Sequence, residues 1–215
     1  MHYKNYRIIG FCLLCAFSVG AMETLPLLRE GKARTLLEKK KPIEARVSGS
    51  VEVGFERMLA LYESPSMVLR IQQVYRDYVV GDEGVEFEIV EVAPGRYEYV
   101  NRKGEQTVVE EVCRVRSSGG GFDLVLYTAG KRFFGSYEAV IHVELRRGNG
   151  EQSDYRAAVY AYPKNSLSRF FGRHLGLVEG FFKRKTVEME ELTVKVCSFM
   201  DEPAKGALGR SAVGE

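Results

Sequence analysis

Residues 166–200 read SLSRFFGRHLGLVEGFFKRKTVEMEELTVKVCSFM, and this amphipathic stretch decides the fold. Its apolar side chains recur at spacings of three, four or eight residues, which places them on one face of a helix. We predict a single helix from Ser166 to about Met200, which would be about 50 Å long and could cross a whole domain. The expected apolar face comprises Leu167, Phe171, His174, Val178, Phe181, Met189, Leu192, Val196 and Phe199.

Upstream of this helix the apolar pattern changes to a period of two, which is typical of strands. Glycine, proline and asparagine clusters separate successive strands and favour antiparallel hairpins. Two short helices, at 54–63 and from Ser64-Pro65 through Val74, interrupt the pattern after the first strand, and Ser64 is a suitable N-cap. The predicted strands are 43–53, 85–89, 97–99, 108–116, 122–128, 137–146 and 155–162.

This order of elements is strand, two short helices, six antiparallel strands and a long C-terminal helix. It resembles the helix-grip superfamily, also called START-like or SRPBCC, with Tyr160-Ala-Tyr-Pro163 forming the corner that leads into the helix. The resemblance implies an α+β domain over 43–200 in which a seven-stranded curved sheet wraps around the helix. It also implies a cavity for a lipid, a sterol, a polyketide or another apolar molecule.

The inward face of the sheet should carry several tyrosines and small residues by alternation, including Ile89, Ala139 and Ala157. A ligand pocket places sparse polar groups among apolar walls, whereas tyrosine is also a good strand former, so a packed core is the alternative. The predicted ligand-binding residues on the sheet and the helix are Phe87, Tyr97, Tyr99, Phe122, Leu124, Leu126, Tyr137, Ile141, Tyr155, Val159, Phe171, His174, Val178 and Phe181.

Three glycines, Gly172, Gly176 and Gly180, repeat every four residues along one side of the predicted helix. Each glycine weakens a helix by about 1 kcal/mol relative to alanine, so three in register need an explanation. Close packing of the helix against the two short helices is one explanation, and space for a ligand is the other.

The first residues have the pattern of a secretory signal. Lys4 and Arg7 precede an apolar run of about fifteen residues, and small residues end it at Ala21. We predict cleavage after residue 21 and export to a periplasmic or extracellular location. The alternative is an uncleaved membrane anchor, although the run is shorter than the roughly 20 residues that span a bilayer.

Outside the domain, residues 22–42 are predicted to form a leader helix or a solvated linker, and residues 201–215 a disordered tail. The leader is basic and leucine-rich, so peripheral contact with a membrane is the alternative interpretation.

Removing the signal leaves an electrically neutral protein. Lys4 and Arg7 leave with it, so the 31 basic residues fall to 29, equal to the 29 acidic ones. Neutrality argues against nucleic-acid binding, which depends on clustered Lys and Arg side chains. The remaining length of about 194 residues suits one domain with one core.

Two cysteines remain after cleavage, Cys113 and Cys197, and they either form one disulfide or stay as buried free thiols. No CxxC or Cys/His metal spacing is present in the mature sequence, so we expect no metal and no cofactor. Neither His142 nor His174 has an evident set of catalytic partners, and His142 should point outward from its strand.

The leading hypothesis is therefore an exported protein that carries or senses a lipid-like or aromatic molecule between the sheet and the C-terminal helix. An enzyme resembling the cyclase and aromatase members of the same superfamily is one alternative. A packed module that acts through its surface in the cell envelope is the other. The sequence does not rank protein partners or oligomeric states.

Overall fold

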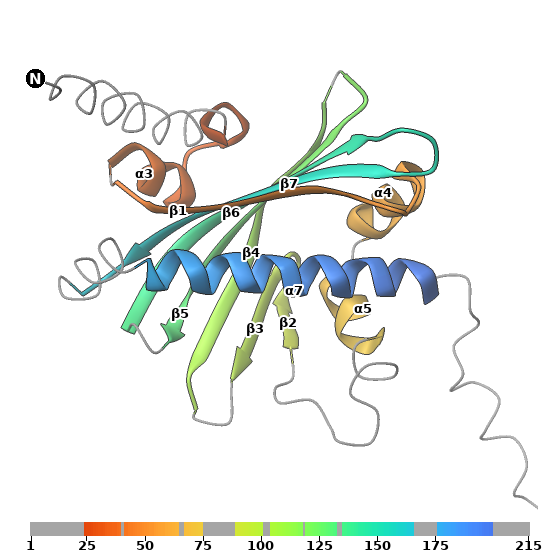
Figure 1. The fold of residues 1–215 in the computed structure, drawn as a ribbon. Coiled ribbons are helices and arrows are strands. Elements are labelled where there is room, and N and C mark those ends of the chain that lie inside the picture. The colour runs from red at the N-terminus through yellow and green to blue at the C-terminus, as the bar shows by residue number, and fades with distance from the viewer. Residues whose placement is uncertain are drawn as a thin grey trace, which may run out of the picture.

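The computed structural model describes residues 24–39, 41–64, 67–74, 89–100, 104–117, 119–132, 135–165 and 176–199. Figure 1 shows one sheet crossed by a long helix. In chain order the elements are η1 (Leu25–Leu27), α3 (Lys32–Lys39), β1 (Ile43–Val51), α4 (Phe55–Glu63), α5 (Met67–Val74), β2 (Ile89–Ala93), β3 (Arg96–Val100), β4 (Gln106–Arg116), β5 (Phe122–Arg132), β6 (Gly135–Arg147), β7 (Ser153–Pro163) and α7 (Leu177–Phe199).

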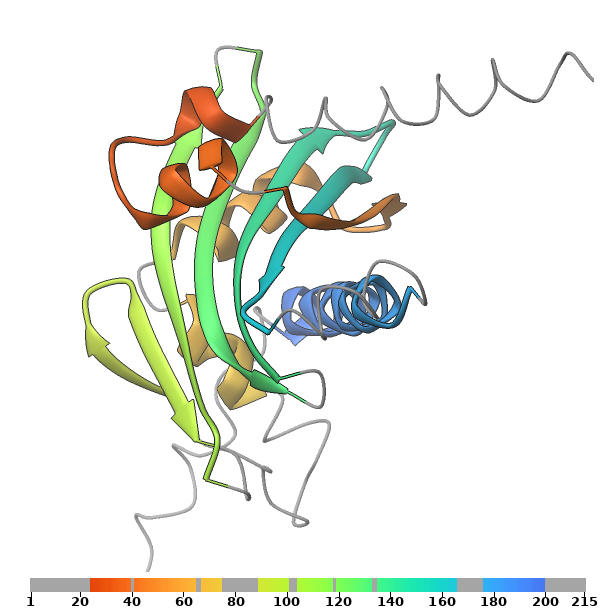
Figure 2. The ribbon, with the colours of Figure 1, turned by 90° about the vertical axis from the view of Figure 1, so that its left-hand side faces the viewer.

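The seven strands form one antiparallel sheet in the order β1-β7-β6-β5-β4-β3-β2. Strands β2 to β7 pair with their neighbours in sequence, as the predicted hairpins require, and β1 returns to pair with β7. The predicted α+β helix-grip order of elements is confirmed. Figure 2 shows the sheet curving around α7.

Helices α4 and α5 form where the sequence predicts them, after β1. Phe55, Met58 and Leu59 recur at spacings of three and four and are buried, so α4 presents one apolar face to the sheet. Met67 and Ile71 do the same for α5. These side chains join Phe122 and Leu124 of β5 in one core cluster.

The C-terminal helix is shorter than predicted, because it begins at Leu177 and not at Ser166. Gly176 has a φ of +63°, which a right-handed helix does not allow, so one continuous helix through this position is excluded. The 23 residues of α7 correspond to about 34 Å. The predicted helical residues 166–175 lie outside the described residues.

The buried face of α7 also differs from the predicted one. Phe182, Thr193, Val196 and Cys197 are buried, whereas the predicted Phe181 is only half-buried. Among the α7 side chains that the structure describes, Val196 is the one that is both predicted and buried. Helix α7 lies along β1 and β7, at one side of the sheet (Figure 2).

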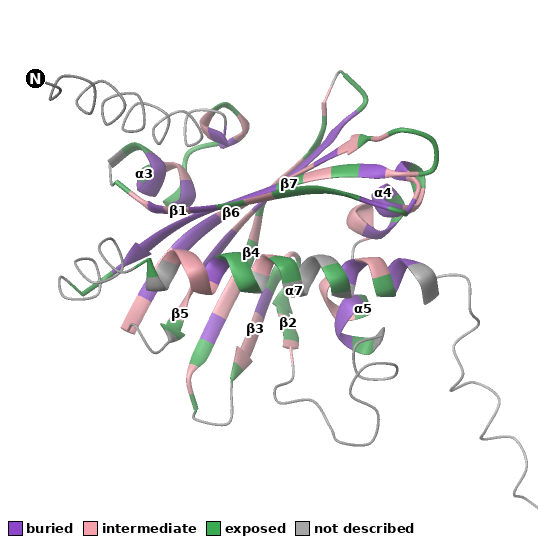
Figure 3. Ribbon diagram, in the orientation of Figure 1, coloured by how far each residue is buried: buried purple, intermediate pink, exposed green. Residues whose placement is uncertain are grey.

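The predicted linker packs against the sheet. We call residues 24–39 the N-terminal strap; its Leu28, Ala33, Leu36 and Leu37 are buried on the face of the sheet opposite α7 (Figure 3). They contact the side chains of Val125, Tyr127, Val140, Ala158, Tyr160 and Tyr162. The segment includes helix α3, and the burial of its leucines differs from what a solvated linker requires.

Candidate functional site

The strand register places all the described residues of the predicted inward face on one side of the sheet. We call the side that faces α4, α5 and α7 the inner face, and the side under the N-terminal strap the outer face. Register pairs such as Tyr99 with Thr107 and Leu126 with Ile141 lie on the same face. The inner face includes Ile89, Tyr97, Tyr99, Phe122, Leu124, Leu126, Tyr137, Ala139, Ile141, Tyr155, Ala157 and Val159.

Several predicted ligand-binding residues pack against helices. Phe122 and Leu124 are about 1% exposed, and the Phe122 ring lies 6.1 Å from that of Tyr62 on α4. The Tyr137 ring meets that of Phe182 on α7 edge to face, at 5.6 Å. At these positions the inner face is core, as in any packed domain.

The remaining part of the inner face, on β3, β4 and the end of β5, combines hydroxyl groups with apolar side chains. We call it the hydroxyl wall; it comprises Tyr97, Tyr99, Thr107, Val109 and Thr128. Tyr97, Thr107 and Thr128 are at most 4% exposed. The predicted residues Phe87, Phe171 and His174, and the side chain of Val178, lie outside the described part of the chain.

Thr107 is the unusual member of the hydroxyl wall. Its side chain is 1% exposed, and its Oγ1 has no hydrogen-bond partner among the described residues. An unsatisfied buried hydroxyl costs about 1–3 kcal/mol. Gly130 lies beside it on β5, where an added Cβ would come within 2.6 Å of this oxygen, so a glycine is needed there. Thr107 is not among the ligand-binding residues predicted from the sequence.

Carboxylates border the hydroxyl wall on the side of β2 and the middle of β4. Glu91 pairs in register with Tyr97, and Glu111 forms an ion pair with Arg114. Burial raises the pKa of Tyr97, and the two carboxylates add to this against a smaller opposing effect of Arg114. Tyr97 is therefore a neutral hydrogen-bond donor at physiological pH.

Of the three glycines that repeat every four residues, the structure describes one within a helix, Gly180. Gly172 lies outside the described residues, and Gly176 precedes α7. At Gly180 an added Cβ would meet only the Arg184 guanidinium, at 3.9 Å. Close packing against the short helices is therefore wrong for Gly180.

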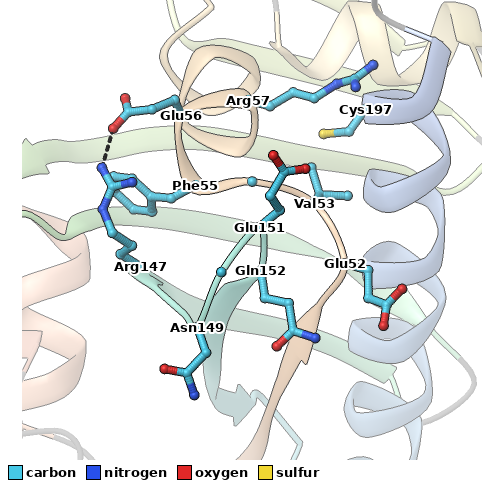
Figure 4. A pocket seen from close by; sticks show the side chains of 12 residues that line it. Glu52, Val53, Phe55, Glu56, Arg57, Arg147, Asn149, Glu151, Gln152 and Cys197 are labelled. Atoms are coloured by element: carbon cyan, nitrogen blue, oxygen red, sulfur yellow. Dashed lines mark hydrogen bonds and ion pairs between the residues drawn. The ribbon is translucent and has the colours of Figure 1, made fainter.

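A wide recess of about 1080 Å³ opens to solvent between the end of β1, the start of α4 and the β6–β7 hairpin (Figure 4). Val53, Phe55 and Cys197 supply its apolar part, and Glu56 and Arg147 form an ion pair across it. None of the predicted ligand-binding residues lines this recess, because it lies beyond the end of the inner face.

The two cysteines lie on opposite faces of the sheet as free thiols. Cys113 packs in the outer-face cluster beneath the strap. Cys197 is fully buried on the inner side, 3.6 Å from the sulfur of Met58, and burial raises its pKa to about 11. The structure does not bring the predicted disulfide partners together.

A polar network on the outer face joins the strap to the sheet, and the sequence analysis missed it. His142 does point outward, as predicted, but it has partners: its Nδ1 lies 3.0 Å from Thr24 Oγ1, and its Nε2 lies 3.1 Å from Asp123 Oδ1. Thr24 also donates to the Tyr160 hydroxyl, and Arg146 donates to both carboxylate oxygens of Asp123. Thr24, Asp123 and His142 are at most 4% exposed, so this network serves docking of the strap.

The same network includes a group with metal-ligand spacing. Asp123, His142 and Glu144 present donor atoms within 4.8 Å of one another. The Arg146 guanidinium lies 3.3 Å from Asp123 and 3.6 Å from Glu144. A positive charge therefore already lies beside the carboxylates that would bind a metal ion. These residues fit an ion-pair network better than a metal centre.

No described helix is both long and apolar enough to cross a bilayer.

Comparisons with known proteins find similar folds only. No protein-family model and no curated protein matches the sequence. A conserved protein from Geobacillus kaustophilus is similar at 12% identity and a TM-score of 0.48, over 73% of this chain and 93% of that one. Norcoclaurine synthase from Thalictrum flavum, in complex with dopamine and hydroxybenzaldehyde, is similar at 10% identity and a TM-score of 0.46, over 82% and 98%. A hypothetical protein from Helicobacter pylori is similar at 6% identity and a TM-score of 0.47, over 80% and 95%. No residue of this chain takes a role from these proteins.

Proposed function

We propose that the protein is an exported, START-like member of the helix-grip superfamily that binds an apolar small molecule against the hydroxyl wall, as a carrier or sensor. The observation that carries the proposal is the buried Thr107 hydroxyl, which has no hydrogen-bond partner in the described structure. Its neighbours Tyr97, Val109 and Thr128 supply an apolar wall with further hydroxyls. Apolar walls with a few oriented polar groups are typical of small-molecule sites.

Adjacent valines on β4 give a matched test of the binding face. Val109 lies on the inner face and Val108 on the outer face, and both are half-buried. We expect the neutral fluorescent probe N-phenyl-1-naphthylamine to bind saturably. Val109→Gln should weaken its binding about tenfold or more, because the amide places a polar group in the apolar wall. Val108→Gln should leave the affinity within about twofold, since it changes only the outer face.

Circular dichroism of each variant establishes that it is folded before titration. Absence of saturable binding to the unmodified protein would contradict the proposed function. Equal losses in Val108→Gln and Val109→Gln would contradict its location.

The identity of the first residue of the secreted protein tests export. Small residues precede the predicted cleavage point, so we expect a secreted product that begins at Met22 in a Sec-competent bacterial host. Ala21→Arg should abolish this product, because a large charged side chain replaces the small residue at the cleavage site. N-terminal sequencing and intact mass check both results, and an unprocessed, membrane-associated chain would contradict export in soluble form.

A further inference from the structure

The hydroxyl wall offers hydrogen bonds without a charge. Its members are Tyr97, Tyr99, Thr107, Val109 and Thr128, and Thr107 Oγ1 can both donate and accept. Val109 pairs in register with Thr128 of β5, and Thr128 pairs with Ala139 of β6, so the three side chains form a row across the sheet. This row is neutral throughout, so a molecule lying along it would meet apolar surface and hydroxyl groups.

Among the side chains that the structure describes, the charges around Tyr97 of the hydroxyl wall are mostly of the wrong sign for an anion. Glu91 lies opposite Tyr97 in the register, and Glu111 follows Val109 by two residues on the same face of β4. Arg114 is the next cation along the inner face of β4. Its guanidinium is already engaged by the Glu111 carboxylate and by the backbone carbonyl of Glu63.

An anionic headgroup at the hydroxyl wall would therefore lose its hydration, and the described part of β4 offers it no cation but Arg114, which is already engaged. Burying an unpaired carboxylate is far more costly than burying a hydroxyl that forms one hydrogen bond. The neighbouring carboxylates Glu91 and Glu111 add repulsion at short range. By contrast, a hydroxyl or carbonyl group would satisfy the Thr107 oxygen.

We propose that the ligand is an uncharged apolar molecule that carries a hydroxyl or carbonyl group, and that this group hydrogen-bonds to Thr107 Oγ1. This inference rests on the proposed function and names its ligand class. It excludes free fatty acids and other anionic amphiphiles as the preferred ligands. Thr107 acts here as a specificity-determining residue.

Three molecules of equal chain length test the inference: octan-1-ol, octanoate and octane, each competing against bound N-phenyl-1-naphthylamine at pH 8. We expect octan-1-ol to compete at least tenfold better than octanoate. Thr107→Val keeps the shape of the side chain and removes its hydroxyl, so it should weaken octan-1-ol about tenfold. The same variant should leave octane within about twofold, because the hydrocarbon makes no hydrogen bond.

Thr35→Val is the matched control, because Thr35 is exposed on α3 and the change is chemically the same. It should alter none of the three affinities. Thermal unfolding gives a second readout. Since the Thr107 hydroxyl has no partner among the described residues, Thr107→Val should unfold at the same temperature as the unmodified chain or higher.

The failures are distinguishable. If the probe binds but octanoate competes as well as octan-1-ol, the ligand class is overturned while the proposed function stands. If Thr107→Val weakens octane and octan-1-ol equally, or lowers the unfolding temperature without changing selectivity, the role of Thr107 is overturned. If the probe does not bind at all, the proposed function itself fails.

Discussion

We expect the replacement of Leu36 and Leu37 together by alanine to lower the free energy of unfolding by about 4 kcal/mol or more. Both leucines are at most 7% exposed and pack against the outer face beside Tyr127, Tyr160 and Val140. A single Leu→Ala change in a core costs about 2–5 kcal/mol, because it removes apolar contact and leaves a cavity. A loss of this size is a large part of the stability of an ordinary domain.

Urea unfolding followed by circular dichroism measures this effect. Thr35→Ala is the matched control, because Thr35 directly precedes Leu36 on α3 but is exposed. This variant should change the free energy of unfolding by less than about 0.5 kcal/mol. An unchanged midpoint for the double variant would mean that the strap is a solvated leader in solution and that its packing contributes nothing.

The sequence of β7 contains one sign of this packing. Residues 157–163 of β7 are buried without interruption, on both faces of the sheet. The matching sequence, Ala-Ala-Val-Tyr-Ala-Tyr-Pro, has no charged residue, and a continuous apolar run indicates a strand that is covered on both sides. A second covering layer could therefore have been predicted, although not which segment provides it.

Six of the strand positions and the shared inner face could be predicted because both depend on local rules, whereas β2 (Ile89–Ala93) shares only Ile89 with the predicted strand 85–89. Alternation fixes the face of each side chain, and glycine-rich turns fix the hairpins. The start of α7 could not be predicted in this way, because an amphipathic period does not reveal that Gly176 adopts a positive φ. The buried face of α7 likewise depends on its placement along β1 and β7, which only the assembled sheet determines.

The hydroxyl wall illustrates the same limit for the site. Tyr97 and Tyr99 could be selected because tyrosines on an inward face are conspicuous in a sequence. Thr107 could not, because threonine is ordinary in strands and its significance lies in having no partner among the described residues, which is a tertiary property. His142 was assigned no partners for a related reason, since Thr24 is 118 residues away in the chain.

Asp123→Asn is the second change with a large expected effect, about 2 kcal/mol of lost stability at pH 7. Asp123 is 4% exposed and receives charge-assisted hydrogen bonds from Arg146 and a contact from His142. Hydrogen bonds to a charged group contribute about 1.5–3 kcal/mol, so loss of the carboxylate weakens the link between the sheet and the strap. Glu52→Gln is the matched control, because this carboxyl is exposed and its neutralisation should cost little.

The pH dependence gives this prediction a definite sign. Burial alone would raise the pKa of Asp123, but the hydrogen bond with His142 and the attraction of Arg146 lower it overall. A carboxyl with a lowered folded-state pKa stabilises the fold above its unfolded pKa, and this contribution is lost as the pH falls through the folded pKa. The difference in unfolding free energy between the unmodified chain and Asp123→Asn should therefore stay near its full value at neutral pH and shrink below about pH 4. Urea titrations from pH 8 to pH 3 measure it, and a difference that grows towards acid would show that the carboxylate is destabilising in the folded state and that the strap is held by its leucines alone.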